Sequence, residues 1–237
     1  MPKGTMIVFS GLDGAGKSTQ IALLQNTLRQ QGYRCKYVWS RGGYTPVFEA
    51  LKRVLRRAPG GVLSLSGNTP QRTQAFGKTW LRRLWLIIAL ADLTLLYAVQ
   101  LRWWRRQGYA VICDRYLWDT LVDFRLNFPT EHVERWWMWK LLVWLAAQPQ
   151  VAFLLLIPVA ESLRRSDIKC EPFRDAPAVL EQRLAHYHQL SQAGTWRVLD
   201  GTEPAQALAA EIASDVMAAT GARLRSNPSM PSLGSQE

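Results

Sequence analysis

The chain has 237 residues, 48% of them hydrophobic and 20% charged, so it can bury one sizeable core and does not require a second domain. The net charge of +11 and a pI near 10.0 favour anionic partners, a class that includes nucleotides, nucleic acids and acidic lipid headgroups. The three cysteines, Cys35, Cys113 and Cys170, match no metal-ligand spacing, which argues against a disulfide framework or a zinc site. No secretory signal precedes the first apolar run, so a cytoplasmic location is expected.

Apolar strands alternate with helical stretches along the first half of the chain. The expected elements are a buried strand at Met6–Ser10, a helix around Ile21, Leu24 and Leu28, a strand at Arg34–Ser40, a basic helix at Pro46–Arg57, a loop at Ala58–Pro70 and helix over Gln71–Arg106.

The same alternation continues through the second half. Strands are expected at Tyr109–Cys113, Val151–Ile157 and Trp196–Leu199, with helical stretches up to Ala147 and helices starting at Ala160, Pro177 and Pro204. Such alternation favours a parallel sheet covered by helices on both faces. The sequence therefore predicts one α/β domain over residues 1–220 and a disordered tail over residues 221–237.

A glycine-rich sequence between the first strand and helix matches the phosphate-loop pattern. Gly11–Ser18 reads G-L-D-G-A-G-K-S, which fits G-x-x-x-x-G-K-[ST]; the flanking strand and helix argue against a chance glycine turn. Backbone N–H groups of such a loop close around phosphate oxygens. Lys17 is expected to bridge the β- and γ-phosphates of ATP, Ser18 to ligate Mg²⁺ and Thr19 to reach the α-phosphate. The residues expected to bind the nucleotide are Gly11, Leu12, Asp13, Gly14, Ala15, Gly16, Lys17, Ser18 and Thr19.

Charged residues follow two other strands at the edge where ligands bind in open α/β sheets. Asp114 closes the strand that starts at Tyr109 and is expected to hold Mg²⁺ through water, while Arg115 is placed to grip an acceptor phosphate. The alternative for this pair is a structural ion pair. Arg41 follows the second strand and is a second candidate clamp, unless it is a solvated loop residue.

Four cations gather after the strand that ends at Ile157. Arg164, Arg165, Lys169 and Arg174 lie in a segment with few apolar anchors, which suggests a mobile lid. Arginines brought over a transferring phosphoryl group stabilise its developing charge. A solvated basic face is the alternative interpretation.

With these features the chain resembles the thymidylate kinases and, more broadly, the P-loop nucleoside-monophosphate kinases. The sequences that carry the resemblance are F-S-G-L-D-G-A-G-K-S-T-Q at Phe9–Gln20, I-C-D-R-Y at Ile112–Tyr116 and R-V-L-D-G at Arg197–Gly201. The resemblance implies a three-layer fold with a five-stranded parallel sheet, helices on both faces and a mobile lid. It also implies ATP and Mg²⁺ as cofactors, phosphorylation of dTMP to dTDP, and a homodimer.

The resemblance further assigns roles to individual residues. Asp13 occupies the position of an acidic loop residue that approaches the acceptor sugar, and Asp92 that of an acidic residue on the central helix near the substrate. Because Gly14 stands where some relatives carry an arginine, the catalytic arginines are expected in the lid, at Arg164, Arg165 and Arg174. Arg41 and Arg115 are expected to hold the acceptor.

The sequence departs from the family pattern on the acceptor side. Leu93 follows Asp92 where the family has an arginine that helps to hold the thymine nucleotide, and Gly42 and Gly43 follow Arg41 directly. Loss of a charged contact changes acceptor selectivity. Two alternatives therefore stay open: a kinase of another acceptor, such as a nucleoside, glycan or lipid-linked group, and a non-catalytic ATP-binding switch.

Tryptophans and arginines are concentrated between Trp80 and Trp144. This combination suits a membrane interface, where indoles and cations meet anionic headgroups, so peripheral contact with the inner membrane face is one hypothesis. The alternative is that the apolar run Leu84–Val99 is a buried central helix; it contains Asp92 and is too short to span a bilayer. Nucleic-acid binding is not expected, because no recognition module accompanies these residues.

Overall fold

A computed structural model describes residues 4–40, 78–169, 175–192 and 194–221. Several sequence predictions lie outside these ranges. They are the basic helix at Pro46–Arg57, the loop at Ala58–Pro70, Arg41, Arg174 and the tail beyond residue 221.

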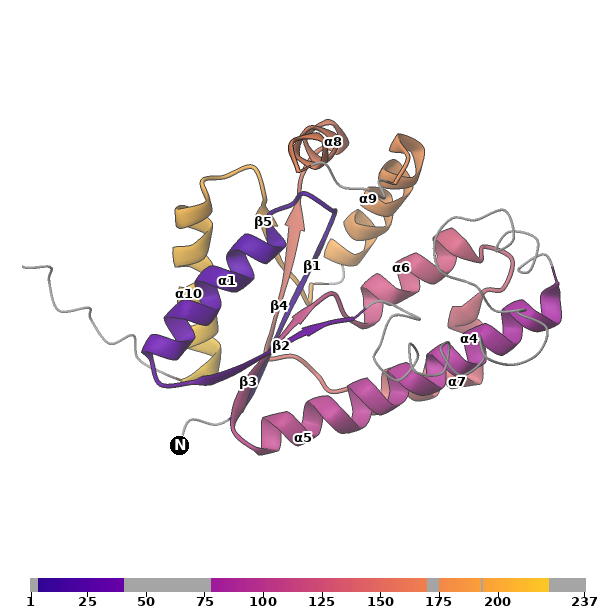
Figure 1. The fold of residues 1–237 in the computed structure, drawn as a ribbon, viewed down its shortest axis with the longest axis horizontal. Coiled ribbons are helices and arrows are strands. Elements are labelled where there is room, and N and C mark those ends of the chain that lie inside the picture. Colours follow the sequence, from indigo (N-terminus) through magenta and orange to yellow (C-terminus); the bar gives the residue numbers. More distant parts are fainter. Residues whose placement is uncertain (1–3, 41–77, 170–174, 193, 222–237) are drawn as a thin grey trace, which may run out of the picture.

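Five parallel strands form the centre of the molecule, in the order β2-β3-β1-β4-β5 (Figure 1). The strands are β1 (Thr5–Gly11), β2 (Arg34–Trp39), β3 (Tyr109–Asp114), β4 (Val151–Leu156) and β5 (Arg197–Asp200). Parallel strands need long crossover connections, which the intervening helices supply. The expected five-stranded parallel sheet is confirmed, with strand ends within about one or two residues of those that the apolar pattern predicts.

Helices cover both faces of the sheet, as the alternation of elements predicts. On one face Ile7 and Phe9 of β1 share a core with α1 (Lys17–Gln30), α9 (Pro177–Ser191) and α10 (Ala205–Thr220). On the other face Met6 and Val8 share a core with α4 (Thr79–Thr94), α5 (Leu101–Arg106), α6 (Leu117–Asn127) and α7 (Trp137–Leu145). A short turn at Val133–Arg135 precedes α7, and α8 (Val159–Ile168) follows β4. Successive strand residues point to opposite faces, so the central strands β1 and β3 contribute to both cores.

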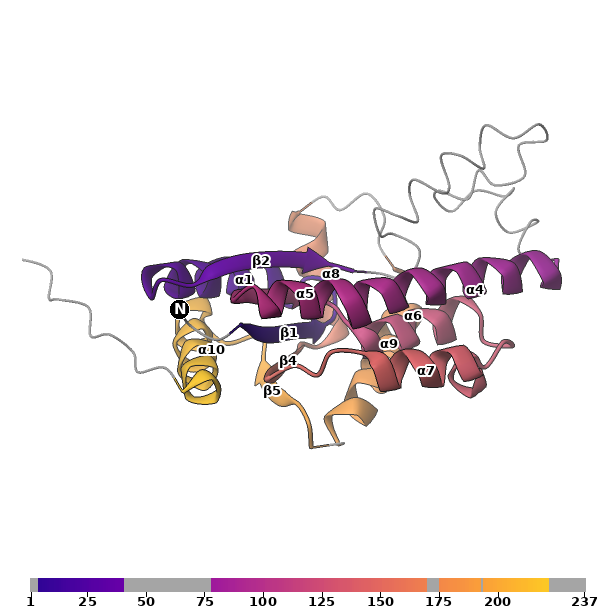
Figure 2. The same cartoon turned by 90° about the horizontal axis from the view of Figure 1, so that it is seen from below.

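The longest helix runs from Thr79 to Arg106 (Figure 2). Its segment Leu95–Gln100, η1, is π-helical and joins α4 to α5. Within this segment the Tyr97 carbonyl accepts a hydrogen bond from the Ala147 N–H at 3.2 Å, and the Tyr97 hydroxyl lies 2.8 Å from Ser40 Oγ. By length and composition this helix could cross a membrane, but half of its most apolar 18-residue window is buried inside the molecule.

Glycine at position 11 is required by the path of the chain between β1 and the phosphate loop. Gly11 has φ of 138°, and a Cβ atom there would lie 2.2 Å from the backbone oxygen of Leu155 on β4. We expect Gly11→Ala to lower the free energy of unfolding by about 2 kcal/mol or more, because backbone rather than a flexible side chain would have to move. Gly32→Ala is the matched control, since Gly32 also has positive φ but a Cβ there would meet no atom within 4 Å. Equal losses for the two variants in urea unfolding would contradict this account.

Candidate functional site

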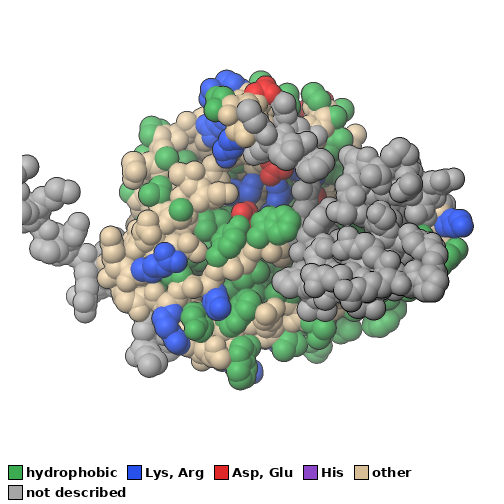
Figure 3. Space-filling model, in the orientation of Figure 1, with side chains coloured by type: hydrophobic (Ala, Val, Ile, Leu, Met, Phe, Trp, Pro, Cys, Tyr) green, Lys and Arg blue, Asp and Glu red, His purple; other side chains and the backbone are tan. Residues whose placement is uncertain are grey.

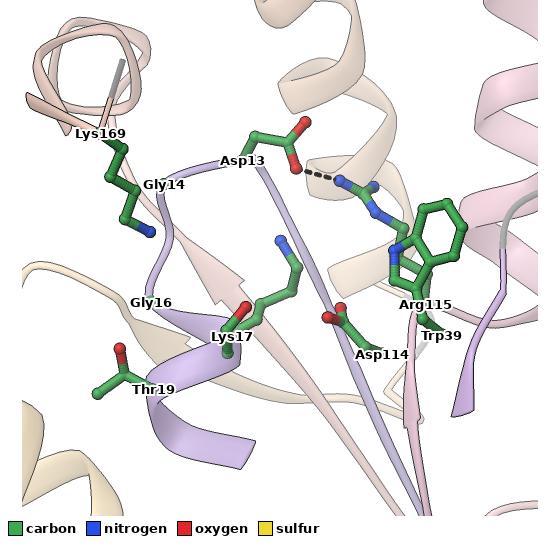
Figure 4. A pocket seen from close by; sticks show the side chains of 10 residues that line it. Asp13, Gly14, Gly16, Lys17, Thr19, Trp39, Asp114, Arg115 and Lys169 are labelled. Atoms are coloured by element: carbon green, nitrogen blue, oxygen red, sulfur yellow. Dashed lines mark hydrogen bonds and ion pairs between the residues drawn. The ribbon is translucent and has the colours of Figure 1, made fainter. Parts of the chain in front are cut away.

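The phosphate loop connects the C-terminal end of β1 to the N-terminus of α1. Gly16 precedes the first residue of α1 in the left-handed conformation, with φ of 88°. The loop therefore directs its backbone N–H groups and the helix N-terminus toward one space. Figure 3 shows Lys, Arg and acidic side chains gathered in a hollow near the centre of the view, and Figure 4 shows them from close by. The pocket is lined by Asp13, Gly14, Gly16, Lys17, Ser18, Thr19, Trp39, Asp114, Arg115 and Lys169.

Lys17 lies inside the curve of the loop. Its Nζ donates hydrogen bonds to the backbone oxygens of Gly11 at 3.0 Å and Leu12 at 2.7 Å. Burial, and secondarily the nearby Arg115 guanidinium, lowers the pKa of Lys17 to about 8. The charged form of Lys17 is therefore less stable in the folded protein than in water, and an anion placed beside it would be attracted strongly.

Asp114 stands at the end of β3 with one carboxylate oxygen unused. Its Oδ2 accepts a hydrogen bond from the Tyr37 hydroxyl at 3.1 Å, whereas Oδ1 is buried and has no hydrogen-bond partner among the residues that the structure describes. A buried carboxylate oxygen without a donor suits a hydrated Mg²⁺ ion. In the described part of the chain no three His, Cys, Asp or Glu side chains form a metal cluster. Ser18, water and phosphate oxygens would therefore supply most of the ligands.

Arg115 is buried directly after Asp114, and its backbone conformation turns its side chain toward the phosphate loop. Its φ of 71° is uncommon for a residue other than glycine, and its N–H donates to the Phe9 oxygen at 2.8 Å. The guanidinium pairs with Asp13, as the dashed line in Figure 4 marks, and donates to the Tyr187 hydroxyl at 3.2 Å. Asp13 and Arg115, two predicted site residues whose pairing the sequence did not indicate, thus meet across the pocket.

Asp119 and Tyr187, which the sequence did not indicate as site residues, contact the Arg115 guanidinium. Asp119 accepts hydrogen bonds from the Tyr187 hydroxyl at 2.7 Å and from Ser10 Oγ at 2.5 Å, and it lies 3.9 Å from Arg115 Nη1. The i,i+4 spacing of Arg115 and Asp119 at the start of a helix is the one signal that could have indicated this pairing. Tyr187 comes from α9 and carries no local signal.

The first turns of α8 rest on the phosphate loop. Ser162 Oγ donates to the Asp13 backbone oxygen at 2.6 Å, and Arg165 Nη1 donates to the oxygens of Gly14 at 3.1 Å and Gly201 at 2.9 Å. Arg164 is exposed and pairs with Glu161 at 2.7 Å. The two expected lid arginines that the structure describes are therefore held differently: Arg165 contacts the loop backbone and Arg164 faces solvent. Their catalytic roles stay predictions.

Glu161 offers a pH test of this arrangement. Hydrogen bonds from Arg164 and Arg165 lower its pKa to about 2. A carboxylate with a depressed pKa contributes stability that is present above its unfolded value near 4.5 and is lost as pH falls through about 2. In a carbon-13 NMR titration we expect Glu161 to stay charged at pH 4, and to be mostly protonated there in an Arg164→Ala, Arg165→Ala variant. Protonation of the native side chain near pH 4.5 would contradict the pairing.

The remaining predicted residues are Asp92, which the structure describes on α4, and Arg41 and Arg174. Asp92 is buried on α4 and does not line the pocket that holds Lys17 and Arg115. The next residue, Leu93, is fully buried in the core between α4 and the sheet. The substrate-binding role of Asp92 stays a prediction, as do those of Arg41 and Arg174, which lie outside the described residues.

The sequence is similar to several thymidylate kinases, although no family model matches it. The thymidylate kinase of Bartonella henselae is 28% identical over 218 residues, which cover 88% of this chain and 93% of that protein. That of Roseiflexus sp. is 28% identical over 232 residues, which cover 89% of this chain and 92% of that protein. That of Caldicellulosiruptor saccharolyticus is 32% identical over 120 residues, 51% of this chain and 49% of that protein. The similarity covers most of the chain and not the phosphate loop alone, so the chain is a P-loop phosphotransferase that is similar to the thymidylate kinases.

Proposed function

We propose that the chain transfers the γ-phosphoryl group of ATP to thymidylate and forms thymidine diphosphate and ADP. The observation that carries this proposal is that two cations from different elements line one pocket: Lys17 of the phosphate loop and Arg115 after β3. A donor phosphate beside Lys17 and an acceptor phosphate beside Arg115 would meet within that pocket. The proteins named thymidylate kinase that resemble the chain support thymidylate as the acceptor.

On the donor side, charge neutralisation is the main task. Phosphoryl transfer passes through a loose transition state with charge spread over the transferring oxygens. Lys17 and the loop N–H groups would face the β- and γ-phosphates. Mg²⁺ held by Ser18 and, through water, by Asp114 would neutralise further charge on these phosphates.

On the acceptor side, the main task of the protein is to orient the acceptor phosphate. The phosphate of a nucleoside monophosphate is already an anionic nucleophile, so no general base is required. The planar guanidinium of Arg115 matches two phosphate oxygens, and its contacts with Asp13 and Tyr187 restrict it to one orientation. Asp13 would then lie beside the acceptor and hold Arg115 in line with the donor.

One observation favours a second candidate, a kinase of a different phosphate-bearing acceptor. Leu93 stands where the thymidylate kinases that the sequence resembles carry an arginine for the thymine nucleotide, and its side chain is fully buried in the core. This position therefore supplies no cation to an acceptor. A nucleoside monophosphate with another base, or a lipid-linked phosphate, would use the same Lys17 and Arg115 chemistry.

The test compares thymidylate with thymidine, which has the same base and sugar but no phosphate. With ATP and Mg²⁺, we expect thymidylate to stimulate ADP release and to yield thymidine diphosphate in equal amount, while thymidine has no effect. Equal stimulation by thymidine would contradict the role of Arg115. ATP binding without turnover of either compound would favour the second candidate.

A further inference from the structure

The hydroxyl of Tyr37 reaches the carboxylate at the end of β3 from the neighbouring strand. β2 is the outermost strand on this side of the sheet, and Tyr37 is 49% exposed, whereas Asp114 is 6% exposed. The Tyr37 hydroxyl donates a hydrogen bond to Asp114 Oδ2 at 3.1 Å. Exposed aromatic residues are common on protein surfaces, so the feature that needs an explanation is the hydrogen bond to a buried carboxylate.

The register of the two strands places this donor beside Asp114. Trp39 lies opposite Asp114 in the parallel ladder, and Tyr37 lies opposite Ile112. Residues two positions apart share a face of a strand, so Tyr37 and Asp114 lie on the same face of the sheet. On the other side of Asp114 the opposite residue is Phe9 of β1, whose side chain has no hydrogen-bond donor. Of these two neighbouring strands, it is therefore β2 that supplies the donor.

The hydrogen bond leaves one carboxylate oxygen available to the pocket. Asp114 Oδ2 accepts from the tyrosine, and Oδ1 is buried without a hydrogen-bond partner among the residues that the structure describes. Asp114 and Lys17 line the same pocket (Figure 4), and their opposite charges attract each other. Lys17 itself donates to the backbone oxygens of Gly11 and Leu12. A donor on Oδ2 opposes rotation of the carboxylate toward the lysine and so keeps Oδ1 free for another partner.

We propose that Tyr37 is a positioning residue of the Mg²⁺ site, which holds the Asp114 carboxylate with Oδ1 available to the hydrated ion. This role rests on the proposed function, because it requires that ATP enters the pocket together with Mg²⁺. Side chains that hydrogen-bond a metal-binding group orient it, and their loss typically lowers metal affinity by about 10- to 100-fold. Asp114 would act through water, so we expect an effect at the lower end of this range.

The experiment measures metal binding in the absence of phosphoryl transfer. Mn²⁺ has the same preference for oxygen ligands as Mg²⁺, and its free concentration is measured by electron paramagnetic resonance. It is titrated into the full chain, which is kept in excess over a non-hydrolysable ATP analogue. Tyr37→Phe keeps the ring and removes the hydroxyl. We expect this variant to raise the Kd of Mn²⁺ about tenfold, while the Kd of the analogue measured in EDTA stays the same.

Two further variants show whether the effect is specific to the carboxylate. Tyr109→Phe is the matched control, because it removes the same hydroxyl from the first residue of β3, at the opposite end of that strand from Asp114. It should bind Mn²⁺ as the native chain does. Asp114→Ala should also weaken Mn²⁺ binding, and adding Tyr37→Phe to it should weaken binding no further, because the hydroxyl acts through the carboxylate. Circular dichroism checks that each variant is folded.

The possible failures of this role and of the proposed function differ in their results. Equal Mn²⁺ affinity of the native chain and Tyr37→Phe would overturn the role of Tyr37, and so would additive losses for the Tyr37 and Asp114 substitutions. An equal loss of affinity for the analogue with and without metal would also overturn it, since the hydroxyl would then affect the whole pocket. A native chain that binds neither the analogue nor Mn²⁺ would overturn the proposed function together with this role.

Discussion

Replacing Lys17 by methionine is expected to lower the rate of phosphoryl transfer by about 10²- to 10³-fold, the loss typical of one electrostatic donor to a transition state. Methionine keeps the length of the side chain and removes its charge. Stability should change little, because the pKa of Lys17 is lowered to about 8 and the fold therefore gains nothing from this charge at neutral pH.

The rate is measured as thymidine diphosphate formed at saturating ATP. Lys78→Met serves as the control, since Lys78 is an exposed lysine at the start of α4. A Lys17→Met protein that is folded and transfers phosphate at the native rate would contradict the proposed mechanism.

Replacing Arg183 by alanine is expected to lower the free energy of unfolding by about 3 to 5 kcal/mol. Arg183 on α9 is almost completely buried and pairs with Asp123 of α6 at 2.5 Å and with Asp175 at 3.1 Å. Its loss would leave the buried Asp123 carboxylate without this partner. For a domain of this size the melting temperature should fall by about 10 °C.

Two further variants separate burial from charge pairing. Arg197→Ala should change stability by less than about 0.5 kcal/mol, because Arg197 is exposed and lies 3.6 Å from Asp215. Arg183→Met combined with Asp123→Leu should recover much of the loss, since it replaces both charges with apolar groups. A loss for Arg183→Ala no larger than that for Arg197→Ala would show that the buried pair contributes little.

Most of the sheet could be predicted because its strands are short apolar runs bounded by glycine or charge. Met6–Ser10 and Val151–Ile157 are buried on both faces, so nearly every residue in them carries the signal. The phosphate loop was predictable for a different reason, because its chemistry requires glycine, lysine and serine at fixed spacing.

The buried side-chain contacts that hold Arg115 and Arg183 in place could not be predicted in the same way. Asp123 and Arg183 are 60 residues apart, and Tyr187 reaches Arg115 across 72 residues, so only the folded chain brings them together. The sequence grouped Arg165 with the lid arginines from charge alone, whereas its contacts with Gly14 and Gly201 depend on where α8 packs. The π-helical turn leaves no local signal either, because it differs from an α-helix by about one residue in a single turn.

The measurement that tests the account most directly is one competition reaction. The chain is incubated with ATP, Mg²⁺ and equal concentrations of thymidylate and the other nucleoside monophosphates, with Lys17→Met as the background, and the diphosphates formed are quantified. Besides the ADP that each transfer releases, we predict that thymidine diphosphate is the main diphosphate formed and that it disappears in the variant. A reaction in which ATP is bound but no acceptor diphosphate forms, or in which the diphosphate of another acceptor dominates, would contradict thymidylate as the acceptor.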